Sequence, residues 1–192
     1  MIGEVLSFLR RQLDSELKAG SEDEAASDKV VFVDGDKMDP LQFKLGAVTL
    51  MLINVEEERV LRPADRYARR NPDGTVSRSF PDIRLSLNLF FVARFKLYDE
   101  AWQQLSQVIG HYQSKPVYDR TNTPGLPAGV EKLIFELRTL NFAEQNEIWN
   151  ALRICHHPSV LYRTNLIVVE DKAVATPGVE AGEAQRKIGG SA

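Results

Sequence analysis

The spacing of hydrophobic positions changes near the middle of the chain, from every second residue to every third or fourth. Between Pro81 and Phe95 the apolar residues that alternate with a more polar set are Ile83, Leu85, Leu87, Leu89 and Phe91. A period of two predicts a strand with one buried face. From about Phe95 the spacing predicts a helix with two apolar sides, one made of Leu97, Ala101, Leu105, Val108 and Tyr112 and the other of Tyr98, Trp102 and Ile109. A long strand therefore runs directly into a long helix, and no room is left between them for a catalytic loop.

The same periodicities predict the other elements. Two further helices are expected, one over residues 2–18 and one opened by Asn141, which has the capping-box spacing with Glu144. The expected strands are Val30–Val33, Ala47–Val55, a half-exposed strand through Leu133, Phe135 and Leu137, and Val160–Val169. Because Ala47–Val55 is apolar almost throughout, we expect a central strand that is covered on both faces.

This order of elements predicts the fold class. It is typical of an α+β single domain, in which a mixed or mainly antiparallel sheet is packed by three helices, on one main face. Residues 1–170 are expected to form this domain. After Glu170 the chain is rich in Ala, Gly and polar residues and has no apolar period, so residues 171–192 are expected to be a flexible C-terminal tail.

Composition narrows the class of protein without adding chemistry. The chain is 43% hydrophobic and 27% charged, as in ordinary globular domains, and its net charge of -3 argues against a general nucleic-acid or anionic-membrane surface. The single cysteine, Cys155, excludes an intramolecular disulfide and fits a reducing cytosol. No run approaches the roughly 18 apolar residues that span a bilayer, and the N-terminal apolar run, interrupted by Glu4, is typical of a helix and not of a signal peptide.

One long polar connection is a candidate protein interface. Residues 62–80 contain five arginines and no lysine, namely Arg62, Arg66, Arg69, Arg70 and Arg78. Asn71-Pro72-Asp73-Gly74 predicts a turn at its tip. Guanidinium groups tolerate burial at interfaces better than ammonium groups, and long connections of this kind are often functional. This composition is equally compatible with a loop that contacts another subunit and with a loop that only extends into solvent. Nucleic-acid binding is the weaker alternative.

The residue types that carry chemistry do not form a recognisable site. Cys155, His156 and His157 are adjacent in the sequence, and adjacent residues rarely converge as zinc ligands or as a nucleophile with its base, so a packed turn is the expected structure. Three consecutive acids, Glu56–Glu58, point alternately up and down if they lie on a strand, so either an exposed strand end or ion pairing with Arg59 and Arg62 is expected. We therefore predict no catalytic, cofactor-binding or metal-binding residues, and no cofactor.

Five blocks in the first 170 residues resemble a known family. They are MIGEVLSFLRRQLDSEL, LMLINVEEERVLR, PDIRLSLNLFFVARFKLYDEAWQQLSQVIGHYQSKPVY, LPAGVEKLIFELRTLNFAEQNEIWNAL and PSVLYRTNLIVVE. In this order they resemble the cap, or tail-terminator, proteins of extracellular contractile injection systems, the antifeeding-prophage type of phage-tail-like particle.

The resemblance implies a non-enzymatic assembly protein. Such a protein caps the distal end of a contractile tube and sheath as a hexameric ring, ends polymerisation and so fixes particle length. Its partners are further copies of itself and the sheath and tube subunits, with no nucleic acid and no membrane span. Its expected location is the bacterial cytoplasm during assembly and then the assembled, possibly released, particle. The alternatives are another ring or adaptor component on the baseplate side, a stand-alone interaction module, and an enzyme that uses the Cys155–His157 run.

Overall fold

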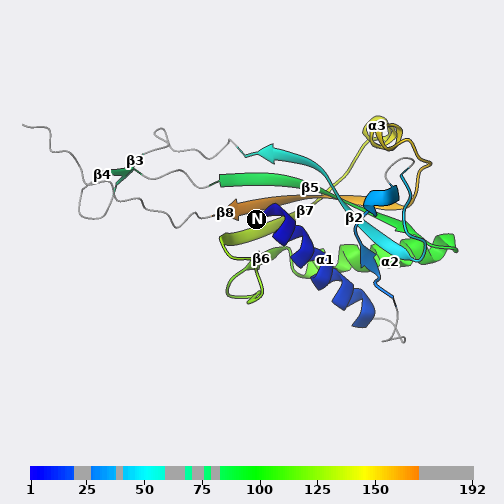
Figure 1. Cartoon of the computed structure of the whole chain (residues 1–192), viewed down its shortest axis with the longest axis horizontal. Helices are drawn as coiled ribbons and strands as arrows, with labels where there is room; N and C mark the ends of the chain where they lie inside the picture. Colours follow the sequence, from blue (N-terminus) through cyan, green and yellow to red (C-terminus); the bar gives the residue numbers. More distant parts are fainter. Residues whose placement is uncertain (20–26, 38–40, 59–67, 71–75, 79–82, 169–192) are drawn as a thin grey trace, which may run out of the picture. The chain divides into compact units, whose positions relative to one another are not determined.

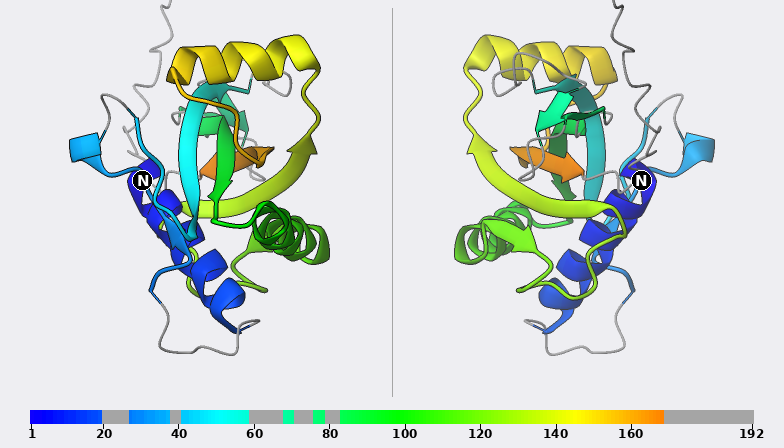
Figure 2. Two further views of the ribbon diagram at one scale, coloured as in Figure 1. Left: turned by 90° about the vertical axis from the view of Figure 1, so that its right-hand side faces the viewer. Right: turned by 90° about the vertical axis from the view of Figure 1, so that its left-hand side faces the viewer.

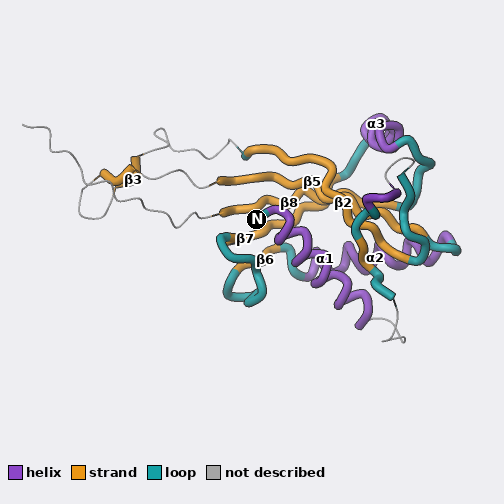
Figure 3. The backbone as a smooth tube through the Cα atoms, in the orientation of Figure 1, coloured by secondary structure: helices purple, strands orange, loops and turns teal. Residues whose placement is uncertain are grey.

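The predicted strand and helix in the middle of the chain form the centre of the fold. The computed structural model describes residues 1–19, 27–37, 41–58, 68–70, 76–78 and 83–168. Strand β5 (Ile83–Arg94) is followed after three residues by helix α2 (Tyr98–Ser114), as Figure 3 shows. The other elements of the described residues are α1 (Ile2–Ala19), β1 (Val30–Val31), a 3-10 helix η1 (Gly35–Lys37), β2 (Ala47–Glu57), β3 (Ala68–Arg70), β4 (Val76–Arg78), β6 (Val117–Asp119), β7 (Val130–Arg138), α3 (Phe142–Leu152) and β8 (Ser159–Val168).

Six of these strands form one mixed sheet, in the order β1-β2-β5-β8-β7-β6 (Figure 1). The only parallel pair in this sheet is β1 with β2, and the other neighbours are antiparallel. The prediction that Ala47–Val55 is a central strand is only partly correct. Strand β1 pairs with β2 at Val48 and Thr49 alone, so in the described part of the chain the rest of β2 is bordered by β5 on one side only.

The larger hydrophobic cluster lies between the sheet and helices α1 and α2. Alternate residues of β5 enter it, among them Leu87, Leu89 and Phe91, which confirms the side of the strand predicted to be buried. Helix α1 contributes Val5, Phe8, Leu9, Leu13 and Leu17, and α2 contributes Ala101, Leu105, Val108 and Tyr112. The Tyr112 ring stacks on Phe135 of β7 with 4.4 Å between centroids. This cluster, which we call the main core, joins both helices to all six strands of the sheet.

The opposite face of the sheet is covered by α3, which Figure 2 shows across the sheet from α1 and α2. The expectation that the helices pack on one main face is therefore wrong. The predicted start of α3 is confirmed, because the Asn141 side chain accepts from the Glu144 N–H and the Glu144 side chain accepts from the Asn141 N–H. A second, smaller cluster lies under α3. It consists of Leu41, Phe43, Phe90, Val92, Trp149 and Leu161.

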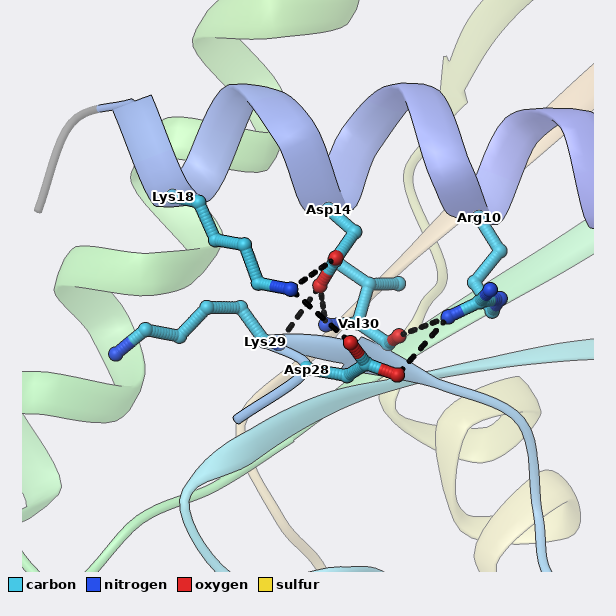
Figure 4. A network of polar contacts seen from close by, with 6 residues as sticks. All are labelled: Arg10, Asp14, Lys18, Asp28, Lys29 and Val30. Atoms are coloured by element: carbon cyan, nitrogen blue, oxygen red, sulfur yellow. Dashed lines mark hydrogen bonds and ion pairs between the residues drawn. The ribbon is translucent and has the colours of Figure 1, made fainter. Parts of the chain in front are cut away.

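A polar network attaches α1 to the edge of the sheet (Figure 4). The largely buried carboxylate of Asp14 accepts from the backbone N–H groups of Lys29 at 2.7 Å and Val30 at 2.9 Å, and it pairs with Lys18 at 2.7 Å. Lys18 also bonds Asp28 at 3.0 Å, and Arg10 reaches the same Asp28 carboxylate at 3.4 Å. Because β1 contains only two residues, these bonds supply much of its attachment to α1.

The chain divides into two units, one made of Met1–Leu61 with Asp82–Glu170 and one made of Arg62–Pro81 with Asp171–Ala192. The elements above, apart from β3 and β4, belong to the first unit. In the second unit the structure describes β3 and β4, which form an antiparallel pair. Ala68 lies opposite Arg78, and Arg70 lies opposite Val76. The predicted turn at residues 71–74 and the predicted tail at 171–192 lie outside the described residues.

Candidate interaction surfaces

The five arginines proposed as an interface are only partly within the described backbone. Arg69 and Arg70 belong to β3 and Arg78 to β4, so these three share a short antiparallel hairpin. Arg62 and Arg66 lie outside the described residues. The sequence predicted a long polar connection here, and the short strands β3 and β4 within it were not expected. That these arginines bind another protein stays a prediction.

The Cys155–His157 run lies in the connection between α3 and β8. The helix ends at Arg153, whose φ of 56° is in the left-handed region, and Cys155 is exposed. His156 Nε2 lies 2.9 Å from Gln145 Nε2, whereas the His157 ring packs edge-on against Phe43. Both imidazoles also contact the Trp149 ring, with 5.2 Å between centroids for His156 and 5.9 Å for His157. Within the described residues, no group of three or more His, Cys, Asp or Glu side chains lies close enough to hold a metal ion.

The acids at the end of β2 take part in cross-strand bonds. Glu56 Oε1 accepts from the amides of Asn54 and Asn88, both at 2.9 Å. Glu58 pairs with Arg163 of β8 at 3.0 Å, and Arg163 Nε donates to Ser86 at 2.7 Å. We expected the partners of these acids to be Arg59 and Arg62, which lie outside the described residues. No local pattern points to Arg163 as a partner, because Glu58 and Arg163 are 105 positions apart in the chain.

A cleft of about 770 Å³ opens between α3, the end of β5 and residues 41–43, which precede β2. It is lined by Leu41, Gln42, Phe43, Arg94, Trp149, Asn150, Arg153, Ile154, Cys155 and His157, none of which is acidic. Phe43 and Trp149 meet edge to face with 6.3 Å between centroids. Arg94 Nη1 donates to the Phe43 carbonyl at 2.5 Å, which fixes one guanidinium in the wall. The cleft thus combines an aromatic floor with positive charge.

Two groups in the cleft are sensitive to what enters it. Trp149 is only 4% exposed, and its Nε1–H has no hydrogen-bond partner among the described residues. The pKa of His157 is lowered, first by burial and then by the positive charge of Arg94 and by His156. His157 is therefore neutral at pH 7 and able to donate or accept a hydrogen bond.

The second apolar side predicted for α2 remains exposed at its first turn. Tyr98 is 71% exposed and Trp102 is 41% exposed, and Leu97, which the spacing had placed on the first side, is also 59% exposed. The Tyr98 and Trp102 rings contact each other edge to face with 6.1 Å between centroids. Asp99 and Glu100, in the same turn, are also exposed, and neither forms an ion pair with a described residue. This corner presents an aliphatic, an aromatic and two carboxylate groups to solvent.

Two solved structures share this fold. The chain is similar to the sheath/tube terminator of an extracellular contractile injection system, PVC, in the extended state, with a TM-score of 0.53 and 15% identity over 88% of this chain and 57% of that one. It is similar also to the anti-feeding prophage tube-terminating cap, with a TM-score of 0.55 and 16% identity over 92% of this chain and 59% of that one. The chain thus spans under two thirds of the length of either protein.

The family follows from the sequence itself. The Pvc16 N-terminal domain family matches residues 4–180, and the chain belongs to that family. The resemblance predicted from the five blocks is thereby confirmed, as is the α+β fold class. Among curated proteins, none matches the sequence significantly. In the part of the chain that the structure describes, no helix has the length and apolar character needed to cross a membrane.

Proposed function

We propose that this chain is a structural cap subunit that ends polymerisation at the distal end of a contractile tube and sheath. The observation that carries the proposal is the family match over residues 4–180, together with the fold shared with two terminators. The protein acts without enzymatic chemistry. It is made in the bacterial cytoplasm and then becomes part of the particle, which is released from the cell.

The mechanism is geometric. A helical polymer grows because its end presents the same binding surface after each addition. A closed ring matches that surface on one side only, so its binding leaves nothing to which the next subunit can attach. In this proposal the ring has six copies, and its partners are sheath and tube subunits.

The open edges of the sheet support a mode of attachment. Beyond Thr49, β2 pairs only with β5 in the described residues, and beyond Phe135, β7 pairs only with β8. An unpaired strand edge presents backbone N–H and C=O groups to which a strand of another chain can add. Strand addition from a sheath or tube subunit would use the backbone, which is compatible with a surface lacking chemical motifs.

The location of the protein on isolated particles tests the proposal. Particles carrying an affinity tag on this chain are labelled with gold and imaged by electron microscopy. We expect label at one end only, opposite the baseplate. Label at the baseplate end would show another ring or adaptor component instead, and particles without label would show a stand-alone interaction module. A Cys155→Ala variant that lost function while still binding the particle end would favour the enzyme alternative.

A further inference from the structure

We propose that the cleft beneath α3 is a socket for the β5–α2 corner of a second copy of this chain. The socket consists of Phe43, Arg94, Trp149, Arg153 and His157, and the knob that enters it consists of Leu97, Tyr98, Asp99 and Glu100. The inference goes beyond capping because it assigns residues to a contact between copies. It depends on the proposed function in one respect, namely that the contact between copies belongs to the capping ring.

The socket has the size and chemistry of a binding site. Its volume of about 770 Å³ falls within the range of roughly 300–1,000 Å³ that is usual for ligand pockets. Two guanidinium groups, those of Arg94 and Arg153, line it, and no carboxylate does. An occupant with negative charge is therefore favoured, and the floor of Phe43 and Trp149 favours an apolar or aromatic group beside that charge.

The knob carries the complementary groups in one turn of chain. Tyr98 and Leu97 expose 71% and 59% of their surface, which is unusual for large apolar side chains outside an interface. Asp99 and Glu100 follow directly and are exposed. An aromatic ring next to two carboxylates matches an aromatic floor next to two guanidiniums.

The knob does not fill the socket of its own chain. Arg94 is in the socket wall and Leu97 begins the knob only three residues later, yet the knob side chains remain largely exposed. The two complementary surfaces are thus both open on one subunit. A second copy of the chain can place its knob in this socket and accept a knob in its own. The chain is therefore self-complementary, although its net charge is -3.

Charge reversal tests this contact in the full chain. We expect Arg153→Glu and Glu100→Arg each to raise the dissociation constant for self-association at least tenfold, measured by sedimentation velocity over a concentration series, because each places like charges together. The double variant should recover a substantial part of the loss. Arg11→Glu on α1 and Glu131→Arg on β7 reverse exposed charges away from the knob and the socket, and serve as matched controls without effect.

Tryptophan fluorescence reports the socket separately. The chain has two tryptophans, so Trp102→Phe leaves Trp149 as the only emitter. We expect the emission of this variant to shift as concentration rises, and the shift to disappear when Tyr98→Ala is added. A chain that stays monomeric to about millimolar concentration overturns the proposal, as does association unaffected by both charge reversals. Particles that are capped normally by Arg153→Glu would overturn the socket and leave the capping function intact.

Discussion

The two faces of the sheet are packed very differently. In the main core, under α1 and α2, Leu89, Leu105 and Leu133 come from three elements and each is 0% exposed, and the hollow beside it, between the two helices, has about 420 Å³. In the small cluster under α3, Val92 is 0% exposed but Leu41 and Leu161 are 8% and 6% exposed, and a larger cleft of about 770 Å³ with two arginines borders it. Close packing favours stability, whereas an open apolar surface beside fixed charges favours binding. We infer that stability and interaction are carried by opposite faces of one sheet.

Removal of β8 should have the largest effect, because this strand belongs to both faces. It lies between β5 and β7 and gives Tyr162 and Leu166 to the main core and Leu161 to the small cluster. A stop codon before Pro158 should therefore abolish cooperative unfolding, as followed by circular dichroism. A stop codon after Asp171 is the control, since we predict residues 171–192 to be a tail that contributes no packing. A folded shorter chain would show that the sheet does not need its central strand.

Substitutions on the two faces should differ in size. Leu105→Ala in the main core should lower the free energy of unfolding by about 2–5 kcal/mol, measured by urea denaturation. Trp149→Ala in the small cluster should cost about 1–3 kcal/mol, less than is usual for a buried tryptophan, because the cleft already borders its ring. In hydrogen exchange, the amides of α3 should open more easily than those of α2. Equal costs for both substitutions would contradict the difference between the faces.

The sequence predicted the elements better than it predicted which of them cover each face. Periodicity identifies the buried side of an element from its own residues, and β5, α1 and the capped start of α3 were predicted correctly for this reason. It does not say which helix covers that side, so the position of α3 on the second face was missed. It also does not say whether an apolar side is buried within the chain, and the exposed Tyr98 and Trp102 of α2 show this.

The cleft was missed because its residues are far apart in the sequence. Its walls come from residues 41–43, the end of β5 and the turn after α3, and no local pattern joins these three segments. The one available signal was Arg94, which ends an apolar run on the same side of β5 as Phe90 and Val92. An arginine that ends a buried face marks the place where the face opens to solvent.

The arginine run is a third region, whose contribution should be to assembly alone. Replacement of Arg66, Arg69 and Arg70 together by Ala should leave the melting temperature nearly unchanged, because exposed substitutions usually cost within about 0.5 kcal/mol. Particle capping should nevertheless be impaired, since arginines often dominate the energy of interfaces. Electron microscopy of particle lengths measures this. Normal lengths would remove the arginines from the interface, and a lowered melting temperature would place them in the folded core.

The smallest effect concerns two histidines, one on each face. Burial is the first cause that lowers the pKa of both His111, whose Nε2 lies 2.6 Å from the Tyr118 hydroxyl, and His157 in the socket. Because the unfolded state then binds more protons, stability should fall slightly as pH drops below about 6.5. If a carboxylate enters the socket, the pKa of His157 should rise on self-association while that of His111 stays constant. Side-chain NMR titration of dilute and concentrated protein measures both pKa values. An unchanged pKa of His157 would show that no carboxylate enters the socket.

The central claim, that this chain ends polymerisation, is tested most directly by particle length. Particles are purified from cells that produce every other component, with and without this chain, and their tube and sheath lengths are measured by electron microscopy. With the chain present we predict one narrow length distribution. Without it we predict a broad distribution or aberrantly long polymers, and restoration of the narrow one when the chain is supplied from a plasmid. Identical narrow distributions in its presence and absence would contradict the account.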